Sequence, residues 1–376
     1  FQRRRLLGPG PCNPDAHSYP MKGFNKKWPK ALSNIWLQNI LFLGLCTFSA
    51  ALITRPVVSA FAVGGLAVIA TVMHLIYKKR TFCSYVCPVS GFLGLYSLAS
   101  LIEVRAKDPD ICRSCKDKAG IVGSEQGWAC PWGLNPSKLA RNNYCGLCLE
   151  CIRACPNDCM TLRARPFCSD VQMKGYDEAW KAFIMITIAV AYSTILLGPW
   201  GILKEWVNIS EMGNWIGFLT YVAVLWLGAL VAVPGLWALA AWLGRTLSGA
   251  ESISAKEIFL KYTYLLVPLG LAAWIAFSLP LILVNTTCIL NTVSDPMGWG
   301  WDLFGTCRMP WSPILPEYIV YAQIPLLLIG LGFALKRGYE IAQGIYDDAI
   351  QGMRSLIPVG IFCTGITMVF VTLFAG

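Results

Sequence analysis

Residues 144–159 of this chain read YCGLCLECIRACPNDC. The cysteines Cys145, Cys148, Cys151 and Cys155 are separated by two, two and three residues, and a proline follows the last one. This is the complete run of a bacterial ferredoxin, in which three thiolates on a tight loop bind one iron–sulfur cluster and the fourth binds a second cluster. Paired thiolates also suit zinc, but four in so short a stretch before a proline favour iron–sulfur chemistry.

A second, incomplete run lies upstream. Cys112 and Cys115 form its first pair, but Lys118 and Val122 occupy the positions of the third and fourth cysteines. Cys130, which is also followed by proline, is then the displaced fourth ligand. Cross-ligation between the two runs assigns two 4Fe–4S clusters. One has Cys130, Cys145, Cys148 and Cys151, and the other has Cys112, Cys115 and Cys155.

The second cluster lacks one thiolate in this assignment. Cys83 and Cys87, spaced by three residues and followed by proline, form half of a ferredoxin run directly after the basic residues 78–80. Either of them could complete the cluster, and Cys159, one helical turn after Cys155, is the local alternative. If Cys83 or Cys87 is the ligand, the second cluster is bonded to the membrane domain and lies nearer the bilayer than the first.

Most of the remaining chain is suited to lipid. Of 376 residues, 56% are hydrophobic and 14% charged, whereas soluble domains average about 25% charged residues. Crossing a bilayer takes about 20 apolar residues, and seven stretches qualify: 31–54, 57–77, 183–203, 215–243, 258–284, 318–335 and 355–374. The fourth contains Pro234-Gly235 and is expected to be kinked. The fold class is therefore an α-helical multi-pass membrane protein with about seven transmembrane helices and an inserted ferredoxin-like α+β domain with two clusters.

The expected regions are an N-terminal segment 1–30, a helix pair 31–80, a ferredoxin-like domain 81–178, and a five-helix domain 179–376 with a loop 285–317. Lysine and arginine cluster on one side of the spans, as they do in cytoplasmic loops. The N-terminus and the Cys-rich domain are therefore expected in the cytoplasm, and the C-terminus and the loop outside. In that loop Cys288 and Cys307 either form a disulfide or remain two thiols.

A Cys-x3-Cys-Pro element leaving a membrane helix, followed by tandem ferredoxin runs, resembles the NapH/NosR-type membrane polyferredoxins over about residues 80–165. The resemblance implies an electron-transfer subunit of a respiratory redox complex in the prokaryotic cytoplasmic (inner) membrane. Such a subunit, either non-catalytic or quinone-reactive, passes electrons between the quinone pool or another donor and partner subunits, such as multihaem cytochrome or reductase subunits. This chain departs from the pattern because its module lies between the second and third spans and contains a single Cys-x3-Cys-Pro.

Other cofactors and partners are not expected. Because the chain has only two histidines, His17 and His74, it lacks the pair of intramembrane ligands that a b-type haem needs, and it has no flavin or nicotinamide fingerprint. His74, near the end of the second span, is a candidate quinone ligand or forms an interhelical hydrogen bond. The net charge of +10 flanks the apolar spans, which indicates the lipid bilayer and not nucleic acid as a partner.

Two other functions remain open from sequence. The clusters of this chain could support maturation or regulation of another metalloenzyme. Alternatively, the pairs Cys83/Cys87 or Cys288/Cys307 could cycle as dithiols in a thiol carrier, although the full ferredoxin run disfavours this. Four further cysteines are interpreted as lone small hydrophobic residues: Cys12, Cys46, Cys168 and Cys363.

Overall fold

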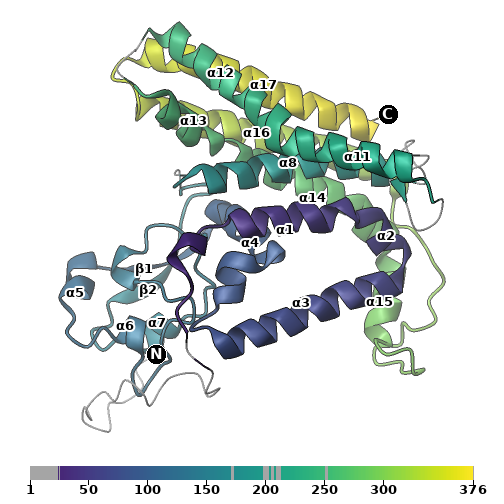
Figure 1. The fold of residues 1–376 in the computed structure, drawn as a ribbon, viewed down its shortest axis with the longest axis horizontal. Coiled ribbons are helices and arrows are strands. Elements are labelled where there is room, and N and C mark those ends of the chain that lie inside the picture. Colours follow the sequence, from purple (N-terminus) through teal and green to yellow (C-terminus); the bar gives the residue numbers. More distant parts are fainter. Residues whose placement is uncertain are drawn as a thin grey trace. The chain divides into compact units, whose positions relative to one another are not determined.

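The computed structural model describes residues 24, 26–170, 173–197, 203–204, 207–208, 213–249 and 253–375. Its backbone contacts divide the chain into two compact units, Phe1–Phe42 with Pro56–Asp170, and Leu43–Arg55 with Val171–Gly376. The described part is mostly helical, as the sequence predicts, and has one two-stranded sheet (Figure 1). Only residues 24 and 26–30 of the expected N-terminal segment lie within the described residues.

The long apolar helix of the first unit is α3, Pro56–Ile76. Proline suits the first helical position because an amide there has no partner inside the helix. An extended stretch covers the other end: the Phe24 amide donates to the Leu75 carbonyl at 2.7 Å, and the Lys26 amide to the Ile76 carbonyl at 2.9 Å. These bonds satisfy carbonyl groups that a helix end leaves open.

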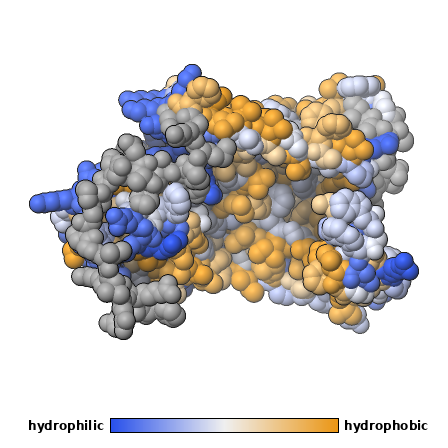
Figure 2. All heavy atoms as spheres, turned by 90° about the horizontal axis from the view of Figure 1, so that it is seen from below, coloured by the Kyte–Doolittle hydropathy of each residue, from blue (hydrophilic) through white to orange (hydrophobic). Residues whose placement is uncertain are grey.

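No side chain of α3 is buried. Its large apolar residues, among them Val57, Phe61 and Val68, are exposed. Apolar side chains also cover much of the molecular face drawn in Figure 2. A helix that is apolar all round needs an apolar environment on every side, which lipid supplies.

The Cys-rich segment is closed by a small antiparallel sheet. Strand β1, Ile102–Ala106, pairs with β2, Met160–Ala164, so that Val104 faces Leu162. Upstream lie the π-helical turn η2 Phe82–Val86, α4 Pro88–Tyr96 and η3 Ser97–Ala99. Between the strands lie α5 Pro109–Ser114, α6 Ala119–Val122, η4 Pro136–Lys138 and α7 Glu150–Arg153. The helices between the strands are short, so several cysteines lie in loops.

The second unit is a bundle of helices. Helix α14 packs along α16, and α17 packs along both α12 and α16 (Figure 1). Helix α8 is the most enclosed of the long helices, with 61% of its most apolar window buried. The described elements are α2 Ser49–Thr54, α8 Tyr176–Leu196, α11 Trp215–Leu227, η6 Gly228–Ala232, α12 Val233–Ser248, α13 Ala255–Thr263, α14 Leu266–Val284, α15 Thr286–Ser294, η7 Pro316–Tyr318, α16 Ile319–Gln343 and α17 Ala349–Ala375.

Close approach in this bundle depends on small residues, as in other membrane bundles. A Cβ atom at Gly244 in α12 would lie 2.3 Å from the Ser355 carbonyl oxygen of α17. A Cβ atom at Gly330 in α16 would lie 2.4 Å from the Ala272 methyl group of α14. Glycine at these two positions therefore sets the spacing between the helices.

Within the described residues, six helices are long and apolar enough to cross a membrane: Pro56–Ile76, Tyr176–Leu196, Trp215–Ser248, Ala255–Val284, Pro316–Gln343 and Ala349–Ala375. The first stretch expected to cross, 31–54, is divided at Phe48 between α1, Trp36–Thr47, and α2. The 12 residues of α1 rise only about 18 Å at 1.5 Å per residue. That length is well short of the hydrocarbon core, which is about 30 Å thick.

In the helix from Trp215 to Ser248, Pro234 is the residue at which the sequence predicts a kink. Proline has no amide hydrogen for the carbonyl four residues earlier, and here that carbonyl belongs to Leu230. The π-helical turn η6, Gly228–Ala232, directly precedes the proline. The Leu230 carbonyl instead accepts a hydrogen bond from Trp180 Nε1 of α8 at 3.2 Å. An interhelical bond thus replaces the missing bond of the helix.

We expect Trp180→Phe to lower the free energy of unfolding by about 1 kcal/mol, because it leaves a carbonyl without a donor in an apolar bundle. Thermal unfolding in nanodiscs measures the loss. Trp242→Phe, at a side chain that is 54% exposed, is the matched control. In a Pro234→Ala background the restored amide can bond to Leu230, so the cost of Trp180→Phe should shrink. An equal cost in both backgrounds would contradict this account.

Candidate iron–sulfur site

The loop that carries the complete ferredoxin run is tightly wound. Leu147 and Leu149 have φ values of 48° and 62°, a left-handed conformation that is uncommon for residues other than glycine. The Cys145 amide donates to the Asn142 carbonyl at 2.8 Å, which fixes the start of the loop. Helix α7 begins directly after Leu149. Strain in such a loop is tolerated where the surrounding structure or a ligand imposes it.

The thiols of this loop line a small cavity, here termed the Cys130 cavity. It is lined by Cys130, Cys145, Cys148 and Cys151, and its other walls are largely apolar, with Trp132 and Leu149 among them. These are the four cysteines that the sequence assigns to one cluster. The cavity measures about 20 Å³, so the thiols must move apart to admit an iron–sulfur cube.

A second, larger cavity of about 240 Å³, here termed the Cys112 cavity, lies on the other side of α7. Its lining includes Cys112, Cys115, Cys155 and Cys159. The Cys159 amide donates to the Cys155 sulfur at 3.3 Å, and Cys112 and Cys159 share a side-chain hydrogen bond. Cys151 also lines this cavity, so a single helical turn separates the two sites.

Basic side chains surround the Cys112 cavity. Arg113, Lys118 and Lys138 contribute to its lining. Lys118, which occupies the position of the third cysteine in the incomplete run, has φ 44° and caps the start of α6. These cations offset the negative charge of a thiolate-ligated group, and they are a feature that the sequence analysis did not assign.

Burial raises the pKa of several of these thiols and so favours their protonated form. It raises the pKa of Cys151 to about 12, with the neighbouring cysteines adding to the effect. Burial, followed by Cys112 and Cys155, raises the pKa of Cys159 to about 12. Burial likewise raises the pKa of Cys145, and the Arg105 guanidinium acts in the opposite direction. Because thiolate is the form that binds metal, loading must release protons.

The donor chemistry of both cavities fits an iron–sulfur cluster, since sets of four thiols are soft ligands that select such clusters or zinc. Their geometry is not that of a loaded site. Among the described residues, no three His, Cys, Asp or Glu side chains are arranged to hold a metal ion. Both sets of thiols would have to rearrange around a cluster as it binds.

Cys83 and Cys87 lie apart from the residues that line either cavity. Cys83 is in the π-helical turn η2, and its carbonyl accepts a hydrogen bond from Gln38 Nε2 at 2.9 Å. Cys87 is the residue before the first turn of α4. Of the three candidates for the eighth thiolate, Cys159 is therefore the one that lies beside Cys112 and Cys155.

Arg80, which follows α3 in the chain, contacts the wall of the Cys130 cavity. The Arg80 amide donates to the Pro131 carbonyl at 3.0 Å, and the Arg80 guanidinium lies 5.5 Å from the Trp132 ring centroid. The sequence expectation that a ligand at Cys83 or Cys87 would bring the second cluster nearest to the membrane helices stays a prediction.

Among the described residues, the other histidine and cysteines that the sequence singles out do not line either cavity. His74 is half-buried in the last turn of α3. Cys288 and Cys307 are both free thiols. Cys46, Cys168 and Cys363 are buried, in keeping with a packing role. Cys12 and His17 lie outside the described residues.

Comparison with known proteins supports the ferredoxin assignment over a short stretch. No protein-family model and no solved structure matches the chain. The methylamine utilization ferredoxin-type protein MauN of Paracoccus denitrificans (strain Pd 1222) is 40% identical over 43 residues. The match covers 11% of this chain and 15% of MauN, so it compares one segment and not two whole proteins.

The chain thus has six helices compatible with a multi-pass membrane protein and a segment similar to a ferredoxin-type protein. Together these findings support a transmembrane protein with an iron–sulfur segment.

We predict that Cys159→Ser lowers the iron content of the anaerobically purified protein by about half, because one cluster loses a thiolate. Cys83→Ser and Cys87→Ser, made separately, should leave the iron content unchanged. Iron and acid-labile sulfide analysis measures both. A loss of iron in Cys83→Ser or Cys87→Ser, with normal iron in Cys159→Ser, would show that the eighth ligand is Cys83 or Cys87 and not Cys159.

Proposed function

We propose that this chain is an iron–sulfur electron-transfer subunit of a membrane redox complex, of the NapH/NosR polyferredoxin type, and that it holds two 4Fe–4S clusters. The observation that carries the proposal is the pair of Cys-lined cavities on either side of α7, with Cys151 in the lining of both. The ferredoxin-type likeness to MauN supports the same chemistry. Bound clusters would supply one-electron transfer.

The proposed ligands divide by cavity. One set is Cys130, Cys145, Cys148 and Cys151, and the other is Cys112, Cys115, Cys155 and Cys159. The first set has largely apolar walls, including Trp132 and Leu149, and one of its members, Cys148, is exposed. It surrounds the second set with basic side chains. Solvent access and charge around the sulfur atoms set cluster potentials, so the two sites are built to differ.

The proposed route for electrons runs between the membrane and a soluble or subunit partner. The Cys130 cavity adjoins the end of α3 through Arg80 and Trp132, and His74 lies in the last turn of that helix. A quinone near His74 is therefore the proposed partner at this end. The more open Cys112 cavity, with its basic rim, is the proposed contact for a partner redox subunit.

The proposed topology places the Cys-rich module in the cytoplasm and loop 285–317 outside. Three apolar stretches separate the two: Tyr176–Leu196, Trp215–Ser248 and Ala255–Val284. An odd number of crossings puts the module and the loop on opposite faces, whether or not α1 and α2 cross. Exposed Cys288 should therefore react with a membrane-impermeant maleimide added to spheroplasts, and Cys288→Ser should lose that label. Labelling of Cys288 only after lysis would show that loop 285–317 lies in the cytoplasm, opposite to the proposed topology.

We expect Cys148→Ala to remove the cluster of the Cys130 cavity, to halve the iron from about eight to about four per chain, and to stop electron transfer. Cys46→Ala and Cys363→Ala, at buried thiols outside both cavities, should keep full iron content and activity. Electron paramagnetic resonance (EPR) of the reduced protein and iron analysis measure these outcomes. An EPR spectrum unchanged by Cys148→Ala would refute the assignment.

A further inference from the structure

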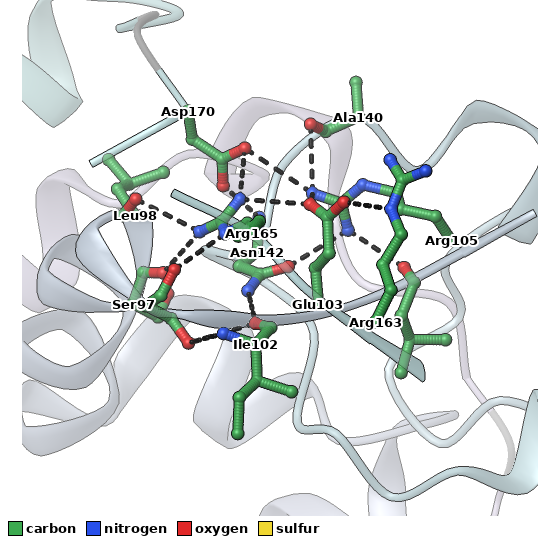
Figure 3. A network of polar contacts seen from close by, with 12 residues as sticks. Ser97, Leu98, Ile102, Glu103, Arg105, Ala140, Asn142, Arg163, Arg165 and Asp170 are labelled. Atoms are coloured by element: carbon green, nitrogen blue, oxygen red, sulfur yellow. Dashed lines mark hydrogen bonds and ion pairs between the residues drawn. The ribbon is translucent and has the colours of Figure 1, made fainter. Parts of the chain in front are cut away.

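A buried network of charged side chains, with Glu103 and Arg105 of β1 among its members, reaches Ala140 and Asn142 (Figure 3). Arg105 forms ion pairs with Glu103 at 3.0 Å and with Asp170 at 3.5 Å, and Arg165 forms one with Asp170 at 2.6 Å. These four side chains are each 8% exposed or less. Arg163 also bonds to Glu103, but its side chain is 57% exposed. Neither the composition nor the cysteine spacing indicates this network.

The network holds the backbone that leads into Cys145. Arg105 donates through Nη1 to Asn142 Oδ1 at 3.0 Å and through Nη2 to the Ala140 carbonyl at 3.1 Å. Asp170 accepts from the Asn142 amide at 2.8 Å. The Asn142 carbonyl in turn accepts from the Cys145 amide at 2.8 Å. Asn142 thus links Arg105 to Cys145, because its side chain accepts a hydrogen bond from Arg105 and its carbonyl accepts one from the Cys145 amide.

The charges of the network do not cancel at every point. Two buried arginines and two buried carboxylates balance in sum, but a ligand is influenced mainly by the charge nearest to it, because the interaction weakens with distance. Arg105 hydrogen-bonds to Ala140 and to the Asn142 side chain, and its guanidinium acts electrostatically on Cys145. Asp170 also contacts Asn142, through its backbone amide, but it pairs more closely with Arg165 than with Arg105.

We propose that Arg105 is a positioning and charge-tuning residue that raises the reduction potential of the cluster in the Cys130 cavity. This inference rests on the proposed function. One-electron reduction adds one negative charge to the thiolate-bound cluster and breaks no bond. A buried cation beside Cys145 stabilises the reduced form, because electrostatic attraction is strong where water is excluded. Arg105 lines neither cavity, but its hydrogen bonds reach the segment that leads into Cys145, so the cluster of the Cys112 cavity should keep its potential.

The test is a dithionite titration of the full-length protein in detergent, followed by EPR. The signal that disappears in Cys148→Ala identifies the cluster of the Cys130 cavity. Arg105→Gln should move the midpoint potential of that signal to more negative values and leave the other signal in place. Glu103→Gln removes a nearby negative charge and should move the same potential in the positive direction. Arg163→Gln, the matched control at the exposed edge, should shift it little.

The outcomes separate the inference from the proposed function. Wild-type protein with no EPR-active cluster would refute the proposed function itself. Protein with two clusters in which Arg105→Gln shifts neither potential, or both equally, would overturn only the role of Arg105. If Arg105→Gln loses iron, Glu103→Gln decides: a positive shift of one potential supports the inference, and an unchanged potential overturns it.

Discussion

The pairing of β1 with β2 is the constraint on which the site depends. Ala106 at the end of β1 lies opposite Met160 at the start of β2. The next bond, from the Lys107 amide to the Cys159 carbonyl at 2.6 Å, extends the pairing to a candidate ligand. Because α5 follows β1 directly, the same pairing carries Cys112 to Cys155 and Cys159. Two half-sites more than forty residues apart in sequence meet for this reason.

The Cys130 cavity and the Cys112 cavity differ in the charge and the burial of their surroundings. The Cys130 cavity has largely apolar walls, and a buried ion-pair network holds the segment that leads into it. Burial acts to raise the pKa of Glu103, but Arg163, Arg105 and Arg165 together hold it below its ordinary value. Glu103 therefore stays ionised and keeps its ion pairs with Arg105 and Arg165. The Cys112 cavity relies instead on basic side chains at a more open surface.

The second unit follows the rules of helix packing in lipid. Backbone groups without a partner are costly there, and the carbonyl released by Pro234 is satisfied by Trp180 from another helix. Glycine residues at the closest contacts let α12 meet α17 and α16 meet α14. Helix α8 also buries Glu178 and Lys181 near its start, outside the span expected from 183 onward. Those charges explain why hydropathy placed the start of that span too late.

Sequence alone determined the class of the protein and most of the candidate ligands, because these properties depend on local spacing. Three cysteines within seven residues can reach one site through a single loop, and a run of about 20 apolar residues suits a membrane wherever the rest of the chain lies. Tertiary structure decided the features that depend on contacts between residues far apart in the sequence. Strand pairing brought Cys159 beside Cys112, and Arg105 met residues 140 and 142 across the module. Likewise, the turn at Phe48 divided an apolar stretch that hydropathy treats as continuous, because averaging over a window does not register a change of backbone direction.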